Sequence, residues 1–147
     1  MRWVTLLLGL ALVGPGSVAT FGGDVDFEAE PAGQEQFGLD VVETEQCGPN
    51  CGAVTAELTN RRSLAARNVT VHARVYAGQT TDDDARLWSD VERVGFLGGE
   101  ESVTLTRQVR WGVRDADAVR DVDRWITVEV VVTADDARVT FTGEERL

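Results

Sequence analysis

The clearest chemical feature of the sequence is the pair Cys47 and Cys51, the chain's two cysteines, which Gly-Pro-Asn separates. In an exported protein two such cysteines most simply form a disulfide, and the residues between them favour a turn. Thiol oxidoreductases instead place two residues between their cysteines at the start of a helix, whereas a strand-like pattern follows here. Two cysteines and one histidine also cannot supply the four ligands of a zinc site. We therefore predict a structural disulfide.

His72 is the single histidine of the chain. It stands between Val71 and Ala73 in an alternating stretch, which places it on the outward face of a strand. A nucleophilic triad would need it beside an activated Ser or Cys and a carboxylate, and the chain has no Gly-x-Ser-x-Gly motif. We predict that His72 is exposed, that the chain has no catalytic residue, and that the protein is not an enzyme.

Two acidic stretches could bind calcium. One is Asp82-Asp83-Asp84, and the other holds Asp115, Asp117, Asp121 and Asp123. Calcium takes about six to eight oxygen ligands from a shaped loop, and neither stretch has the Asp-x-Asp-x-Asp-Gly pattern with a closing Glu. We expect solvated surface acids here, and neither a metal nor another cofactor.

Two features concern surface ligands. Asn68-Val69-Thr70 is a glycosylation sequon, so Asn68 is a candidate glycosylation site in an exported protein. Trp88, Trp111 and Trp125 could stack on a ligand, but two of the three adjoin apolar runs, which favours a place in the core. A module that binds sugar or calcium through acidic loops and Trp residues is therefore the alternative function.

The charge composition indicates a salt-rich environment. The 14 basic residues are all Arg, against 25 Asp and Glu, for a net charge of -11. At molar salt the Debye length is only about 3 Å, so neighbouring carboxylates repel little, and added acids favour solubility. The composition resembles that of proteins exported by extreme halophiles. No Lys/Arg cluster provides a footprint for nucleic acid, which excludes that class of partner.

The N-terminus resembles an export signal. Arg2 precedes the apolar run 3–13, a Gly-Pro-Gly break follows, and Ser17-Val18-Ala19 is a small-x-small cleavage pattern. Residues 1–19 are thus predicted as a signal peptide, or as an N-terminal membrane anchor if they stay uncleaved. Either one places the rest outside the membrane, either secreted or at the cell surface. Residues 20–36 are rich in Gly and acids and are predicted to be a flexible tether.

Alternation of Val with polar residues predicts strands in the remaining part, 37–147. Strong patterns cover 54–59, 69–76, 103–105, 126–133 and 139–141, and weaker ones cover 39–43 and 87–94. One helical stretch, 115–122, lies between two strands as a short crossover. About seven strands with little helix predict an all-β, two-sheet sandwich, and a barrel is the alternative.

The register of two strands predicts a specific core, because side chains of a strand alternate between its faces. Val71, Val75, Val128 and Val130 are expected to be buried. Thr70, Arg74, Thr127 and Glu129 are expected to be exposed.

Three segments carry a family resemblance. Val54-Thr55-Ala56-Glu57-Leu58-Thr59-Asn60, Ala66-Arg67-Asn68-Val69-Thr70-Val71 and Val94-Gly95-Phe96-Leu97-Gly98-Gly99-Glu100-Glu101-Ser102 resemble the CARDB/FxLYD group of immunoglobulin-like domains. The last turn carries an extra Glu, and Arg61-Arg62-Ser63 replaces the usual Gly after Asn60. The resemblance implies an immunoglobulin-like sandwich. It also implies a role like that of the adhesion, spacer and accessory modules of cell-surface proteins, and it brings no catalytic residue.

We therefore expect a non-catalytic structural or interaction module, secreted or at the cell surface. Its partner would be a protein or a cell-envelope component, and it would contact a membrane only through an uncleaved N-terminal segment.

Overall fold

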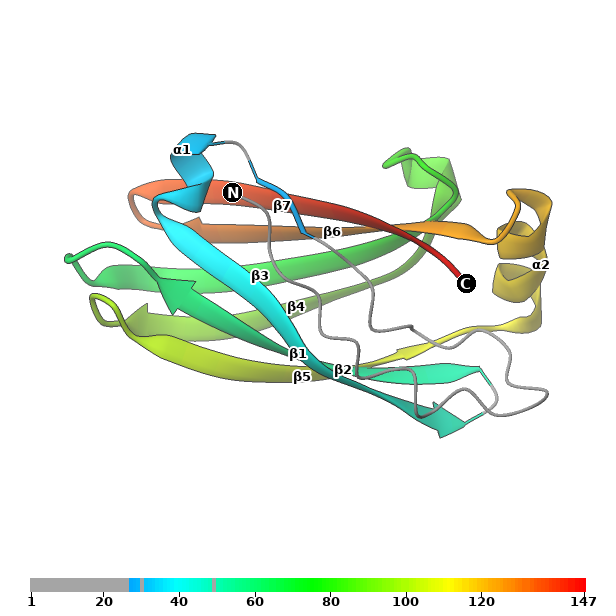
Figure 1. The fold of residues 1–147 in the computed structure, drawn as a ribbon, viewed down its shortest axis with the longest axis horizontal. Coiled ribbons are helices and arrows are strands. Elements are labelled where there is room, and N and C mark those ends of the chain that lie inside the picture. Colours follow the sequence, from blue (N-terminus) through cyan, green and yellow to red (C-terminus); the bar gives the residue numbers. More distant parts are fainter. Residues whose placement is uncertain (1–26, 30, 49) are drawn as a thin grey trace.

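Seven antiparallel strands form two sheets that pack face to face (Figure 1). The computed structural model describes residues 27–29, 31–48 and 50–147. Its three-stranded sheet has the order β1-β2-β5, and its four-stranded sheet has the order β4-β3-β6-β7. The strands are β1 Phe37–Gly48, β2 Cys51–Asn60, β3 Ala66–Ala77, β4 Arg86–Leu97, β5 Ser102–Arg110, β6 Trp125–Ala134 and β7 Ala137–Arg146. The predicted immunoglobulin-like sandwich is confirmed.

The helical segments connect or flank the sheets. α2 (Val113–Asp121) carries the chain from β5 in one sheet to β6 in the other, which confirms the predicted crossover, and Figure 1 shows it at one end of the sandwich. The short α1 (Pro31–Gln34) precedes β1, and the 3-10 turn η2 (Asp83–Ala85) precedes β4. Each predicted strand segment lies inside an observed strand, including the two weaker patterns.

The core lies between the inner faces of the two sheets. Leu58 from the three-stranded sheet and Ile126, Val132 and Phe141 from the four-stranded sheet are fully buried. Val71, Val75, Val128 and Val130 are buried too, which confirms the predicted inward register of β3 and β6.

The predicted exposure of the outward-facing residues on these strands is wrong for Thr127 and overstated for the others. Thr127 is only 2% exposed, because its hydroxyl donates to the carbonyl oxygen of Gly78 at 2.6 Å in the segment that follows β3. Thr70, Arg74 and Glu129 are half-buried. β3 and β6 are the two central strands of their sheet, so neighbouring side chains cover much of their outer face.

Part of the predicted tether packs on the sandwich. Phe27 is 5% exposed and belongs to the core. Glu28 exchanges two backbone hydrogen bonds of 3.0 Å with Thr142 of β7, and Arg61 donates to the carbonyl oxygen of Gln34 at 3.0 Å. The segment is acidic and Gly-rich, but one aromatic side chain and its backbone groups suffice to attach it. Residues before 37, Phe27 among them, therefore pack on the sandwich.

The predicted signal peptide or anchor, 1–19, and residues 20–26 of the tether lie outside the described residues. In the part of the chain that the structure describes, no helix is long and apolar enough to cross a membrane.

Candidate functional site

The predicted disulfide between Cys47 and Cys51 is present, with their Cα atoms 5.1 Å apart. It joins the end of β1 to the start of β2, where Gly48 pairs with Cys51. Cys51 is 2% exposed, whereas Cys47 is exposed. The bridge therefore closes a hairpin between two strands, which is a structural role.

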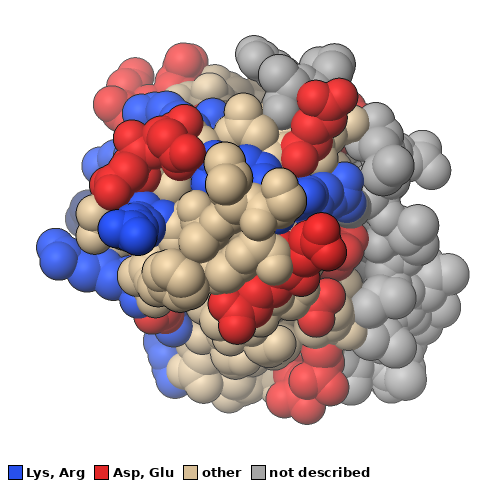
Figure 2. All heavy atoms as spheres, turned by 90° about the vertical axis from the view of Figure 1, so that its left-hand side faces the viewer, with Lys and Arg blue, Asp and Glu red and all other residues tan. Residues whose placement is uncertain are grey.

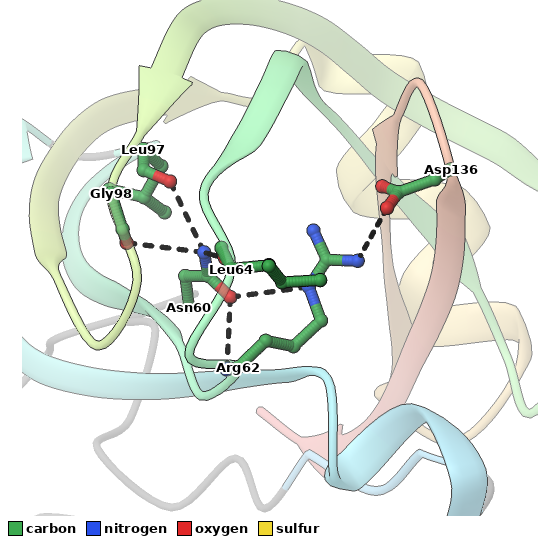
Figure 3. A network of polar contacts seen from close by, with 6 residues as sticks. All are labelled: Asn60, Arg62, Leu64, Leu97, Gly98 and Asp136. Atoms are coloured by element: carbon green, nitrogen blue, oxygen red, sulfur yellow. Dashed lines mark hydrogen bonds and ion pairs between the residues drawn. The ribbon is translucent and has the colours of Figure 1, made fainter.

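A buried amide organises the opposite end of the sandwich (Figure 3). Asn60, the last residue of β2, is fully buried. Its Nδ2 donates to the carbonyl oxygens of Leu64 at 2.8 Å, Gly98 at 3.1 Å and Leu97 at 3.2 Å. Its Oδ1 accepts from the backbone N–H of Arg62 at 3.1 Å. One side chain thus fixes both the β2–β3 loop and the β4–β5 turn.

Arg62 extends this network across the same end. Its guanidinium contacts Asp136 in the β6–β7 turn at 3.0 Å and lies over the ring of Phe37, 5.5 Å from the centroid. The hydrogen bond from Arg62 lowers the pKa of the exposed Asp136 carboxyl. Asn60 and Arg62 therefore connect the β2–β3 loop, the β4–β5 turn and the β6–β7 turn. In the sequence these two residues drew attention only through the comparison with the CARDB/FxLYD pattern.

The β4–β5 turn approaches the β2–β3 loop very closely at Gly99. A Cβ atom on Gly99 would lie 2.2 Å from the carbonyl oxygen of Ser63. The backbone N–H of the next residue, Glu100, donates to the carbonyl oxygen of Arg62 at 3.0 Å. Only glycine leaves room for this contact, which holds the two loops together.

His72 lies on the outer face of the four-stranded sheet in a chain of polar contacts. Arg74 lies 3.1 Å from His72 Nδ1 and 3.2 Å from Glu129, and Glu129 also accepts a 3.2 Å hydrogen bond from the hydroxyl of Tyr76. The predicted outward face is confirmed, but the side chain is half-buried and not exposed, because Arg74 lies against it. Burial and then the charge of Arg74 lower the pKa of His72.

The candidate glycosylation residue, Asn68, has a local structural role. It is exposed and has a φ of 54°, in the left-handed region that Asn tolerates better than most residues. Its Nδ2, the atom that a glycan would modify, donates to Asp135 at 2.8 Å. The residue stands at an irregularity in the pairing of β3 with β4. Its glycosylation stays a prediction.

Acidic residues of both stretches are engaged in ion pairs or hydrogen bonds. Asp83 faces Arg86 at 3.6 Å, Asp117 faces Arg120 at 2.7 Å, and Asp123 faces Arg146 at 2.9 Å. Asp115 accepts a hydrogen bond from the backbone N–H of Gly112 at 2.8 Å. Among the described residues no group of three or more His, Cys, Asp or Glu is placed to hold a metal ion. Trp111 is buried, and Trp88 and Trp125 are half-buried.

One charged cluster was missed by reasoning from the sequence. Asp90 and Glu92 pair with Ala73 and Val71, so they point to the inner face of the four-stranded sheet. Arg107 points inward from β5, opposite Val54. Its Nε lies 2.8 Å from Asp90, and its guanidinium also contacts Glu92. This inter-sheet ion cluster closes the side of the sandwich between β4 and β5, and inward charges of this kind keep edge strands from pairing with other chains.

Comparison with solved structures concerns the fold alone. Red sea bream transglutaminase superposes with a TM-score of 0.50 at 13% identity, over 76% of this chain and 16% of that one. Bacteroides uniformis β-glucuronidase 2, covalently bound to cyclophellitol-6-carboxylate aziridine, gives 0.49 at 13% identity, over 75% and 13% of the two chains. Bifidobacterium adolescentis GH3 β-glucosidase gives 0.41 at 23% identity, over 74% and 17%. The chain thus spans less than a fifth of each of these proteins.

The family comparison is more informative. No curated protein sequence matches the chain. The model of the archaeal immunoglobulin-like domain matches residues 38–147, from β1 to the last residue. Because this match covers the whole seven-stranded sandwich, the chain belongs to the archaeal immunoglobulin-like domain family.

Proposed function

We propose that this domain is a non-catalytic module outside the cell, either secreted or held at the surface by its N-terminal segment. We further propose that it contacts another protein or a cell-envelope component through the end of the sandwich that Asn60 organises. The immunoglobulin-like fold supports a structural role. So do the polar contacts of the described residues, since those at Asn60 and at Arg107 hold loops and sheets together.

The observation that carries the proposal is a pair of exposed apolar side chains at that end. Leu64 is 68% exposed in the β2–β3 loop, and Phe96 is 63% exposed beside the β4–β5 turn. The amide of Asn60 binds the carbonyl oxygens of Leu64 and Leu97, so both segments are held within reach of one side chain. Large exposed apolar groups on neighbouring segments are suited to burial against a partner.

The charges around this end suit a contact made at high salt. Figure 2 views this end and shows a stretch of uncharged surface between acidic and basic groups. Exposed charged residues there include Arg67, Arg93, Glu100 and Glu101. Salt at molar concentration screens their long-range attraction, whereas apolar contacts persist. The affinity should therefore come mainly from Leu64 and Phe96, and the charged rim should add specificity.

Capture from envelope fractions in molar salt tests this proposal, with the tagged full chain as bait. The double variant Leu64→Ser/Phe96→Ser should lose the partner that the unaltered chain retains. Val113→Ser is the matched control, because Val113 is 77% exposed on α2 at the other end of the sandwich. Equal capture by the double variant and the unaltered chain would contradict the proposed contact.

A second set of variants separates this function from an enzyme or a calcium site. His72→Ala and the triple replacement of Asp82, Asp83 and Asp84 by Ala should leave the function in the cell unchanged. If changing His72 alone abolished the function in the cell, the proposal of a non-catalytic module would be wrong. A catalytic or metal-binding role would then be favoured.

The proposed location has its own test. The mass of the protein recovered outside the cell, or from its envelope, identifies the N-terminal residue. A chain starting at Thr20 supports a cleaved signal peptide, and an intact chain in the envelope supports an anchor. Recovery of the intact chain only from the cytosol would contradict both.

A further inference from the structure

A cavity of about 110 Å³ lies between the two sheets. Both sheets line it, with Val41, Val54 and Leu105 on one side and Val71 and Val130 on the other. Phe27 also lines it and is contributed by the segment that pairs with β7. The walls are almost wholly apolar. This space is distinct from the end of the sandwich at which we place the partner contact.

The cavity has a simple origin in the sequence. Ala56 of β2 and Ala73 of β3 face it, at inward positions where a larger aliphatic side chain would fill the space. At the adjoining inward positions of the edge strands stand Asp90, Glu92 and Arg107, whose charged groups gather at the margin. These two small residues and three charged residues thus leave the middle of the space between the two sheets unfilled.

The ion cluster forms the margin of the cavity between β4 and β5. Arg107, Asp90 and Glu92 have side chains that are 37%, 44% and 32% exposed, so they reach from the cavity to solvent. Two carboxylates face one guanidinium, and an anion would meet net negative charge on this route. A cation would leave these carboxylates for an apolar interior, where an unpaired charge is strongly disfavoured. The margin therefore selects for an uncharged molecule.

Besides the charged residues at the margin, one uncharged polar residue lines this apolar space. Thr44 lines the cavity and is 5% exposed. Its Oγ1 is buried and has no hydrogen-bond partner among the described residues. A buried hydroxyl without a partner is unfavourable, and a ligand carrying one hydrogen-bonding group would satisfy it. An unfilled apolar space and an unsatisfied hydroxyl are independent observations that indicate the same kind of occupant.

We propose that the cavity binds a small, uncharged, mainly apolar molecule with one hydrogen-bonding group, which Thr44 binds. Its size is set by comparison with an engineered, Leu/Ile/Phe-lined protein cavity of about 150 Å³ that takes benzene. The ligand is therefore about the size of a single six-membered ring. It enters past Arg107, where the lining side chains of Arg107, Asp90 and Glu92 are 32% to 44% exposed.

The test uses benzene and phenol, a pair that differs by one hydroxyl. Each is titrated into the full-length protein in molar salt, and binding is followed by the NMR shifts of the Val and Ala methyl groups. Both probes should bind the unaltered chain and raise its thermal midpoint. In Thr44→Val, which keeps the shape and removes the hydroxyl, the phenol-to-benzene affinity ratio should fall about threefold or more.

A second variant blocks the site. Ala73→Leu should fill the cavity and abolish the shifts caused by both probes, and Ala73→Val is the smaller replacement if leucine prevents folding. Retention of the sandwich in each variant is checked by circular dichroism and a cooperative thermal transition. Failure of the unaltered chain to bind either probe would overturn the proposal. Binding that survives in the blocked variant, or an unchanged affinity ratio in Thr44→Val, would overturn it as well.

Discussion

Asn60 donates a 3.2 Å hydrogen bond to the carbonyl oxygen of Leu97, so the last residue of β2 in one sheet holds the last residue of β4 in the other. The same Nδ2 binds the β2–β3 loop and the β4–β5 turn. The apolar end that bears Leu64 and Phe96 depends on it, which connects the stability of the fold to the proposed function.

Removing this amide should destabilise the protein strongly. Asn60→Ala would leave the carbonyl oxygens of Leu64, Leu97 and Gly98 without their donor at a fully buried position, and we expect a loss of about 2 to 4 kcal/mol in the free energy of unfolding. Asn50→Ala, at an exposed turn position, is the matched control and should cost under about 0.5 kcal/mol. Denaturant unfolding measures both. Equal effects would mean that the network is not formed in solution.

Two adjacent glycines should differ sharply in their tolerance of alanine. In Gly99→Ala the new Cβ would lie 2.2 Å from the backbone oxygen of Ser63, so a loop must move, and we expect a cost of about 2 kcal/mol or more. In Gly98→Ala the nearest atom is the Glu101 carboxylate, 3.2 Å away, which can rotate aside. We expect a change within about 1 kcal/mol there. A thermal midpoint that falls equally in the two variants would contradict the close approach.

Most of the fold could be predicted from the sequence because hydrophobic alternation is a strong signal wherever one face of a strand is buried. Residues 54–59, 69–76 and 126–133 follow it closely, and they lie in β2, β3 and β6. The pattern of β4 is weaker for a physical reason. Its inward positions include Asp90 and Glu92, which break the alternation because an edge strand can carry charges that a central strand cannot.

The functional features were harder to predict because they depend on contacts between distant parts of the chain. The cavity arises only when Ala56 of one sheet, Ala73 of the other and Thr44 line the same space. The buried place of Phe27 follows from the bridge between Glu28 and β7, which an acidic, Gly-containing segment does not suggest. The family was predicted correctly from the sequence at the level of an immunoglobulin-like domain. The CARDB/FxLYD subgroup and the halophilic origin stay predictions.

The stability of the sandwich should decrease in mild acid through His72. A guanidinium carries only N–H donors, so Arg74 must donate the hydrogen bond to His72 Nδ1. Nδ1 can accept it only while the imidazole is neutral. Burial and the charge of Arg74 lower the pKa of His72 in the folded protein from the ordinary value of 6.5. The unfolded chain therefore takes up the proton first. The stabilisation is complete above pH 6.5 and is lost as the pH falls below it, toward the lowered pKa.

His72→Gln isolates this effect. Thermal midpoints of the unaltered protein should fall from about pH 8 to about pH 5.5, and the decline should be smaller in the variant. The other titrating groups are common to both proteins and cancel in the comparison. If the thermal midpoints of the two proteins fell equally with pH, His72 would be excluded as the source of the acid sensitivity.

The acidic surface should make stability depend on salt. With 25 carboxylates against 14 Arg, the folded chain has a net charge of -11. The Debye length grows from about 3 Å at 1 M salt to about 10 Å at 0.1 M, so repulsion between neighbouring carboxylates is unmasked as salt is removed. We expect the thermal midpoint to fall steeply over that range. Replacing Asp82, Asp83 and Asp84 together by Asn should reduce the slope, because these three exposed carboxylates lie side by side with one Arg86 guanidinium 3.6 Å from Asp83. A midpoint that does not change with salt would refute the adaptation to high salt, and an unchanged slope in the triple variant would exclude this acidic run as a cause.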